Sequence, residues 1–354
     1  MPPATPPREP TADDLYLTVR APVFRDPHGG TPAPLDPHGE LIRNAFLDGD
    51  RAAGWRFRPE LDLLRPWLVF DDAAGTTRPV TAELLDRLGL TREDAIERAR
   101  AGAANLFGGS GAAAVSIDDG GPADTFAVRG LGRARRAAAL VTPSLFEPWR
   151  ARVPGELLVL PACDDDIVLV GSEAEHLTEA VHSAIGYHRR SGDRRLSPIP
   201  YAVADNRLRP WRPPTDSRAY PAVREAEVAQ RVLAYADFAS ELHQHLDSGE
   251  RDVAAAERGA SKSTALPFSY CCASLVGPIQ YLPFVEHAGF ENSEPQQDGW
   301  AWVPFDRLRD LPGASMTPAW QYGLPVIRFE PPTDAEAHRQ LSAALRERAG
   351  DPWR

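Results

Sequence analysis

GELLVLPACDDDIVLVG, residues 155–171, contains two short apolar runs separated by a proline, an alanine, a cysteine and three aspartates. Leucine, valine and isoleucine in short runs favour strands, whereas proline and aspartate interrupt pairing and favour turns. The stretch therefore predicts a β-hairpin with strands over residues 157–160 and 167–170.

The three aspartates of this stretch raise the question of a metal site, with Asp164 and Asp166 as its candidate ligands. A divalent cation would need further oxygen or imidazole ligands from elsewhere, and the spacing of a calcium-binding EF-hand loop is missing. Because aspartate side chains also bond to backbone amides in turns, the simpler interpretation is a hairpin turn with no bound metal. Three ionised carboxylates would repel one another, so a contact with an arginine would fit this turn.

The composition is that of a globular protein, with 43% hydrophobic and 25% charged residues among 354. Fifty acidic residues against 39 basic ones give a formal net charge of -11. A surface of this sign repels phosphate backbones and anionic lipids, so we expect neither a nucleic-acid nor a membrane partner.

Several expected absences point to the cytoplasm. The first residues, MPPATPPREPTADD, lack a basic region followed by an apolar run, so we expect no signal peptide, and no apolar stretch approaches the roughly twenty residues of a membrane-spanning helix. Three cysteines, Cys163, Cys271 and Cys272, are a sparse and odd set, which agrees with a reducing compartment. The glycine run at residues 107–114 lacks the P-loop and dinucleotide-binding spacings, so we predict no cofactor.

Residues 78–106, RPVTAELLDRLGLTREDAIERARAGAANL, predict two consecutive helices, starting after Thr81 and at Thr91. They are followed by FAVRG (126–130), the predicted hairpin, a helix over 173–188 and LSPIPYAV (196–203). This order, over roughly residues 65–210, resembles the YtpQ-like family, a group of bacterial proteins of unknown function. The matching residues are Ala104, Asn105, Leu106, Gly155, Glu156, Leu157, Pro161, Asp166, Leu196, Ser197 and Pro198. The resemblance implies an α+β fold and carries no catalytic residues.

Changes in composition divide the chain into three segments. Residues 1–40 are rich in proline and glycine, which predicts an N-terminal arm, with ordered structure starting near Gly39 in a helix over 40–49. Residues 41–215 are expected to form the α+β domain that resembles the YtpQ-like family. Residues 216–354 open with a long helix over 221–246 and continue with strand-like runs, which predicts a second, smaller α+β module. The expected fold class is therefore α+β, with a mixed or antiparallel sheet and flanking helices.

Three histidines, His176, His182 and His188, recur in the helix predicted over residues 173–188. A spacing of six residues turns successive side chains by about 120° around a helix, so the three imidazoles cannot meet at one metal. We expect them at the surface or edge of the helix.

One functional hypothesis is a hydrolase or transferase. Cys271 or Cys272, with His287 and Glu286 or Glu291, supplies the residue types of a cysteine nucleophile, a base and an orienting acid. Adjacent cysteines on a strand point to opposite faces, so we expect at least one of them in the core. The hydrolase or transferase could instead use a metal held by Asp164, Asp166 and a distant histidine.

The favoured hypothesis is a non-catalytic protein-interaction or regulatory protein, with an immunity-like or complex-assembly role as examples. Aromatic side chains anchor protein interfaces, and four of them lie close together in the C-terminal segment. The candidate contact residues are Trp300, Trp302, Trp320 and Tyr322. A core position is the alternative for each of these side chains. A concave site that unites a cysteine, a histidine and an acid would favour the enzyme, and an aromatic patch would favour the binding protein.

Overall fold

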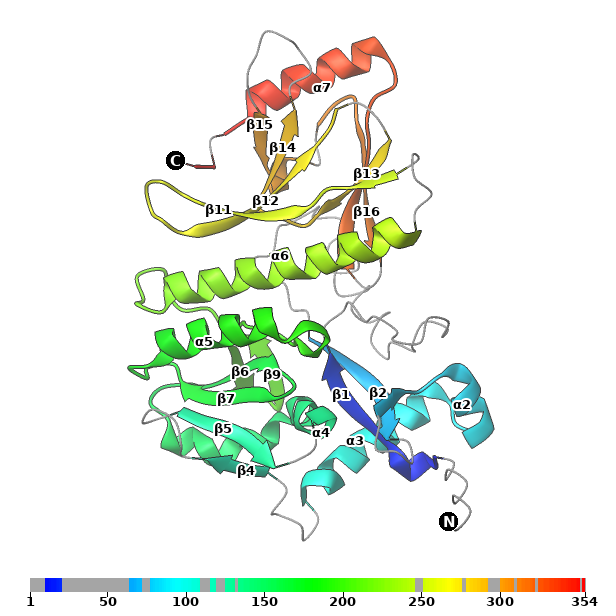
Figure 1. Ribbon diagram of the computed structural model, residues 1–354, viewed down its shortest axis with the longest axis vertical. Coiled ribbons are helices and arrows are strands. Elements are labelled where there is room, and N and C mark those ends of the chain that lie inside the picture. The colour runs from blue at the N-terminus through cyan, green and yellow to red at the C-terminus, as the bar shows by residue number, and fades with distance from the viewer. Residues whose placement is uncertain are drawn as a thin grey trace, which may run out of the picture. The chain divides into compact units, whose positions relative to one another are not determined.

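In the computed structural model the described residues form two compact units, the first ending at Ala219 and the second starting at Tyr220 (Figure 1). The boundary expected from the sequence lies between residues 215 and 216. The residues that the structure describes are 10–20, 64–71, 77–108, 115–118, 125–130, 133–245, 251–275, 278–291, 300–308, 311–321, 324–350 and 352–353.

The first unit begins with an antiparallel sheet in the order β1-β2-β3. Its elements are η1 (Ala12–Asp14), β1 (Leu15–Arg20), β2 (Arg65–Asp71) and β3 (Thr77–Pro79). The prediction that ordered structure starts near Gly39 is wrong, because β1 pairs with β2 along its whole length and Leu15, Tyr16 and Leu17 are buried. The helix expected over residues 40–49 lies outside the described residues.

Both predicted helix starts after this sheet are confirmed. Helix α2 (Ala82–Leu88) begins after Thr81, whose hydroxyl accepts a hydrogen bond from the Leu84 amide at 3.2 Å. Helix α3 (Arg92–Gly108) follows Thr91, whose hydroxyl accepts from the Asp94 amide at 3.1 Å. Each bond satisfies an amide that the first turn of a helix leaves free.

A larger antiparallel sheet completes the first unit, in the order β4-β5-β7-β6-β8-β9. Its strands are β4 (Val115–Asp118), β5 (Thr125–Gly130), β6 (Leu157–Cys163), β7 (Asp166–Gly171), β8 (Tyr201–Ala204) and β9 (Arg207–Pro210). Its helical segments are α4 (Arg133–Ala138), η2 (Ala139–Val141), η3 (Pro143–Arg152), α5 (Leu177–Arg190) and η4 (Gly192–Arg194). Helix α5 packs on β6 and β7.

The predicted hairpin is confirmed as β6 and β7, which pair from Leu157 opposite Gly171 to Cys163 opposite Asp166. Asp165 lies in the turn, and two arginines bind it. Arg136 donates to the Asp165 carboxylate and to its backbone carbonyl, each at 3.0 Å, and Arg194 forms a second ion pair with the same carboxylate. The aspartate-rich turn therefore has the arginine contact that its charge favours.

His188 corrects the expectation that the α5 histidines lie at the surface or edge, because its side chain is only 4% exposed. Its Nδ1 atom lies 3.4 Å from the carbonyl oxygen of Ala162 on β6. Burial, together with the nearby Arg195, lowers the pKa of His188 to about 4, so the ring stays neutral at neutral pH.

The second unit combines two mixed sheets with helices α6 (Tyr220–His245) and α7 (Ala335–Arg348). The sheets follow the orders β10-β13-β17-β16 and β11-β12-β14-β15, each with one parallel pair, β10 with β13 and β12 with β14. The strands are β10 (Arg251–Val253), β11 (Ala256–Ala260), β12 (Pro267–Ala273), β13 (Ile279–Pro283), β14 (His287–Glu291), β15 (Trp300–Pro304), β16 (Ser315–Gln321) and β17 (Leu324–Glu330), and η5 (Phe305–Arg307) follows β15. Phe290 and Phe329 join the two sheets, with ring centroids 5.6 Å apart. Figure 1 shows α6 running beside β11 and β12, which it contacts.

The α+β fold class is thus confirmed, with antiparallel and mixed sheets and flanking helices in separate modules. Within the described part of the chain, each helix is too short or too polar to span a bilayer.

Candidate functional site

Strand β12 separates two environments in the second unit. Its neighbours are β11, antiparallel, and β14, parallel. Because successive side chains of a strand point to opposite faces, Ser269 and Cys271 lie on one face and Phe268, Tyr270 and Cys272 on the other. The first face meets α6, where Arg231 reaches Ser269, and the second carries a group of aromatic rings.

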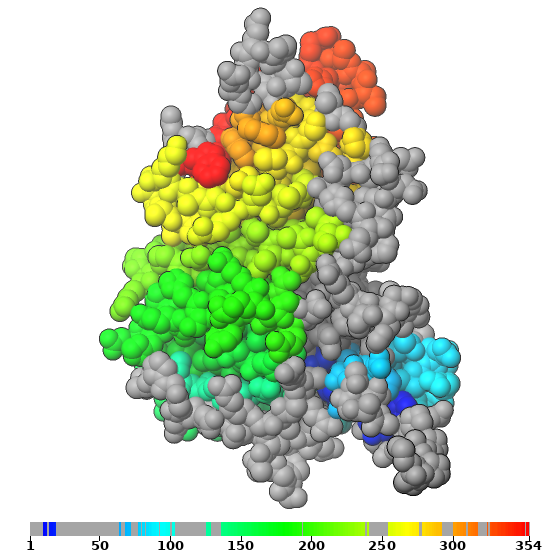
Figure 2. All heavy atoms as spheres, in the orientation of Figure 1, coloured from blue at the N-terminus to red at the C-terminus, as the bar shows by residue number. Residues whose placement is uncertain are grey.

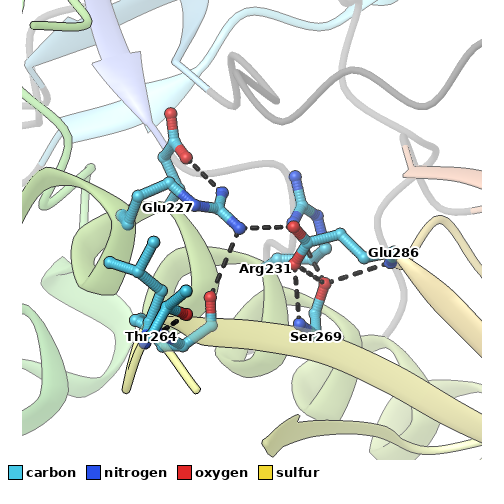
Figure 3. Close-up of polar contacts among 8 residues, drawn as sticks. Glu227, Arg231, Thr264, Ser269 and Glu286 are labelled. Atoms are coloured by element: carbon cyan, nitrogen blue, oxygen red, sulfur yellow. Dashed lines mark hydrogen bonds and ion pairs between the residues drawn. The ribbon is translucent and has the colours of Figure 1, made fainter. Parts of the chain in front are cut away.

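On the α6 side lies a buried arginine–glutamate network, formed by Arg224, Glu227, Arg231, Ser269 and Glu286 (Figure 3). Arg224 donates to Glu227 at 2.5 Å, to Glu286, and to the carbonyl oxygen of Pro267 at 3.3 Å. The Glu286 carboxylate also accepts from the Ser269 amide at 2.8 Å and from its hydroxyl at 3.2 Å. The network joins the helix to the sheet through charged hydrogen bonds.

The charges in this network are matched, with two guanidinium groups and two carboxylates. Burial opposes the charged form of Arg224, but Glu286 and Glu227 outweigh it and raise the pKa of that side chain. Arg231 is only 1% exposed, and burial lowers the pKa of its guanidinium against the same two glutamates. A buried charge set of this kind is tolerated only when each member is paired, so we interpret the network as structural.

The candidate catalytic residues do not converge. Cys271 is fully buried on the α6 side, where Glu286 is engaged by Arg224, while Cys272 and His287 lie on the opposite face. Within that face Cys272 stands beside Gly289 in the register, and His287 beside Tyr270. The candidate set is therefore divided between two sides of one sheet, with Cys271 and Glu286 toward α6 and with Cys272, His287 and Glu291 on the opposite face.

The thiols also lack the electrostatics of a nucleophile. Burial raises the pKa of Cys271 and of Cys272, and the nearby Glu257 raises both further. A reactive cysteine needs the opposite, a pKa lowered by a cation or a helix N-terminus. The half-buried His287 has its pKa lowered by burial, so it is not a positive neighbour that would favour a thiolate.

The outward side of this sheet carries what we call the aromatic face, made of Phe268, Tyr270, His287, Trp300, Trp302 and Trp353. The Tyr270 ring meets the Trp302 ring nearly edge to face, with centroids 5.2 Å apart. Trp353 packs at 5.0 Å from Phe268 and 6.1 Å from Trp302. These separations and angles are those that aromatic quadrupoles favour.

The C-terminal segment contributes Trp353 to this face through two backbone hydrogen bonds. The Gly350 amide donates to the Trp302 carbonyl at 2.8 Å, and the Trp353 carbonyl accepts from the Lys262 amide at 2.7 Å. Figure 2 shows the last described residues, in red, at the surface against the yellow region of β11 and β12.

Two glycines allow the rings to lie close to the sheet. A Cβ atom at Gly289 would lie 2.7 Å from the Trp302 ring, and one at Gly259 would lie 2.4 Å from the Phe268 ring. Either contact is far inside van der Waals distance, so a side chain at these positions would displace the ring.

The aromatic face is partly open to solvent. Among the described residues, the most exposed large hydrophobic residues are Trp300, at 44%, and Tyr187 on α5, at 46%. Trp300 and Trp302 lie side by side, with centroids 6.1 Å apart and planes inclined by 37°. An exposed indole beside a second, half-buried one provides an apolar contact surface.

The remaining predicted sites have mixed outcomes. Trp320 lies on β16, but its side chain is outside the described residues, as is Tyr322 altogether. Asp164 and Asp166 flank Asp165 in the hairpin turn, and across the described ranges no group of three or more His, Cys, Asp or Glu side chains is placed to hold a metal. Binding by Trp300 and Trp302 stays a prediction.

Sequence reasoning missed the buried network and most of the aromatic face. Arg224, Glu227 and Arg231 are spaced at i, i+3 and i+7, which places them on one side of α6, and that signal was available. Phe268 and Tyr270 alternate on β12, but nothing in the sequence indicates that Trp353 packs against them.

No protein-family model, no curated protein and no solved structure matches the chain. The resemblance to the YtpQ-like family therefore stays a prediction.

Proposed function

We propose that this chain is a non-catalytic protein-interaction or regulatory protein that holds a protein partner on its aromatic face. The observation that carries the proposal is the exposed Trp300 beside Trp302, on a platform that Tyr270 and Trp353 complete. Tryptophan and tyrosine are enriched among the residues that dominate binding energy at interfaces. Complex assembly and an immunity-like role are two examples of functions in which such a surface would bind a protein partner.

The way the face is built supports this proposal. Trp302 and Phe268 lie over glycines, and Trp353 is fixed by backbone hydrogen bonds, so the rings are held in place before a partner arrives. Preorganised side chains lose little conformational freedom on binding, which favours affinity. The thiols, by contrast, have raised pKa values, and the Glu286 carboxylate is already bound by Arg224, which favours binding over catalysis.

Affinity capture with the full chain tests the proposal. The tagged wild type and two variants, Trp300→Ala and Tyr187→Ala, are used to capture proteins from cells of the native host. Tyr187 is the matched control because it is as exposed as Trp300 but lies on α5 in the first unit. We expect a stoichiometric partner that Trp300→Ala loses and Tyr187→Ala keeps. Capture that is the same with all three proteins would contradict a role for the aromatic face.

A further inference from the structure

Each of the two outer strand pairs of the aromatic face, β11 with β12 and β14 with β15, places an acid beside an aromatic ring. Glu257 on β11 is paired with Tyr270 on β12, and Glu291 on β14 is paired with Trp300 on β15. Paired residues of neighbouring strands project to the same side of the sheet, so both carboxylates belong to the aromatic face. The Tyr270 hydroxyl donates to Glu257 at 2.5 Å, which fixes the ring beside its acid.

The charge of this face has one sign. Alternation places Glu257, Gly259, Cys272, Gly289, Glu291 and Pro304 on it beside the rings, and the described strand positions there contain no arginine or lysine. Arg258, the cation of β11, belongs to the opposite face, where it pairs with Glu225 of α6 at 3.3 Å. Lys262, the one lysine of the sequence, lies outside these strand positions, in the turn between β11 and β12 whose amide binds Trp353. The aromatic and acidic strand positions are complementary to a positively charged ligand.

Arginine is the cation that fits both components. Its planar guanidinium stacks on an indole ring and at the same time donates hydrogen bonds to a carboxylate. We infer that the aromatic face binds an extended, arginine-bearing segment of a partner protein, with guanidinium groups on Trp300 and Tyr270 and with Glu291 and Glu257 as their counter-charges. This inference rests on the proposed function and names its partner class.

The distance between the two acids sets the spacing of the arginines. Glu257, Tyr270 and His287 share one row across the sheet, and Glu291 lies four residues beyond His287 on β14. Strands about 4.8 Å apart and a rise of about 3.3 Å per residue put the two positions about 16 Å apart. An extended peptide covers this distance in about five residues, so arginines with roughly that separation reach both acids.

Isothermal titration calorimetry with two matched peptides tests the inference. One is a peptide of arginine–glycine repeats, and the other carries citrulline, which is uncharged and nearly isosteric, in place of every arginine. We expect the full-length protein to bind the arginine peptide at least about tenfold more tightly than the citrulline peptide. Trp300→Ala should weaken binding about tenfold and Glu291→Gln about threefold, and Tyr187→Ala should leave it unchanged.

Equal affinity for the two peptides would overturn the inference, because recognition would then not depend on charge. Absence of binding to both peptides would overturn it as well. The proposed function fails separately, when capture of a partner from cells does not depend on Trp300. A Trp300-dependent partner together with a failed peptide titration would leave the binding face in place and remove only the arginine segment.

Discussion

The two faces of strand β12 differ in how their charged side chains are buried and paired. Toward α6, Arg224, Arg231, Glu227 and Glu286 are buried or nearly so, and each finds an opposite charge or a hydroxyl. On the aromatic face, Glu257 and Glu291 stand beside rings without an arginine or lysine among the described positions of the same face. Neighbouring residues of one strand point to opposite faces, and this alternation alone separates the two environments.

This contrast separates the charges that stabilise the fold from the charges that are available for binding. Desolvation makes a buried charge expensive, so the charges of the network must be satisfied inside the protein. Charges at a half-exposed surface remain hydrated and contribute little to folding. We therefore expect substitutions on the α6 side to change stability and substitutions on the aromatic face to change binding.

The largest effect is expected for Glu286→Ala. Its removal leaves Arg224 and Arg231 with one carboxylate between them and takes the acceptor from the Ser269 amide. Loss of one partner of a buried ion pair costs about 3–5 kcal/mol, measured as the free energy of unfolding in urea. Glu291→Ala is the control, because Glu291 lies close to Glu286 in the sequence but is exposed on the other face of the sheet, and we expect the change to stay within about 0.5 kcal/mol. Equal losses for both variants would contradict the contrast between the faces.

His188 in the first unit sharpens the comparison, because it is buried with Arg195 and Arg189 as its charged neighbours. Its pKa is lowered from 6.5 to about 4 on folding, so the unfolded chain takes up its proton first as the pH falls. The contribution of the neutral His188 to the free energy of unfolding is complete above pH 6.5. It is lost as the pH falls from 6.5 through 4, by about 3 kcal/mol in total.

Unfolding free energies measured from pH 7 to pH 4 check this prediction, and His188→Gln should flatten the dependence. Since the variant could itself be destabilised, an NMR titration of the wild-type imidazole provides a second measurement. A His188 midpoint near 6.5 would show that its burial does not keep it neutral.

A smaller effect is expected at the hairpin turn. Asp165 is 28% exposed and pairs with Arg136 and Arg194, which are 17% and 44% exposed, so solvent weakens both ion pairs. Asp165→Ala should cost about 1 kcal/mol, because partly exposed pairs contribute little. Denaturation with urea measures the change, and Asp165→Asn tests how much of it is charge. A loss comparable to that of Glu286→Ala would mean that the turn, too, depends on buried charge.

The smallest effect on stability is expected for Trp300→Ala. Trp300 is 44% exposed and lies at the end of β15, so we expect a change within about 0.5 kcal/mol and an unchanged circular dichroism spectrum. The same variant has the largest expected effect on binding. Substantial unfolding by this substitution would assign the ring to the core and remove the main support for the binding face.

The sequence predicts those elements that depend on local patterns. The hairpin around Asp165, the starts of α2 and α3 and the core position of at least one of Cys271 and Cys272 follow from alternation and capping, and the structure confirms them. Strand β1 was missed because its few residues are surrounded by a proline-rich segment, and its burial depends on pairing with β2, far along the chain.

The site was less predictable than the fold. The prediction of α6 took no account of the spacing of its polar residues, since burial of Arg231 also requires Glu286, which only the tertiary fold brings to the helix. Trp300 and Trp302 are predicted contact residues from the sequence, but Trp353 joins them through backbone hydrogen bonds to distant residues. The prediction of His188 at the surface or edge of its helix was wrong, because the sequence of a helix does not show that β6 packs against this side chain.

The most direct test of the account is an NMR titration of the protein carrying ¹⁵N-labelled tryptophan with the arginine–glycine peptide, with indole signals assigned by single substitutions. We predict that the signals of Trp300, Trp302 and Trp353 shift together, while that of Trp149, which packs on the core of the first unit, does not. A titration in which Trp149 shifts and these three signals stay in place would contradict the assignment of binding to the aromatic face.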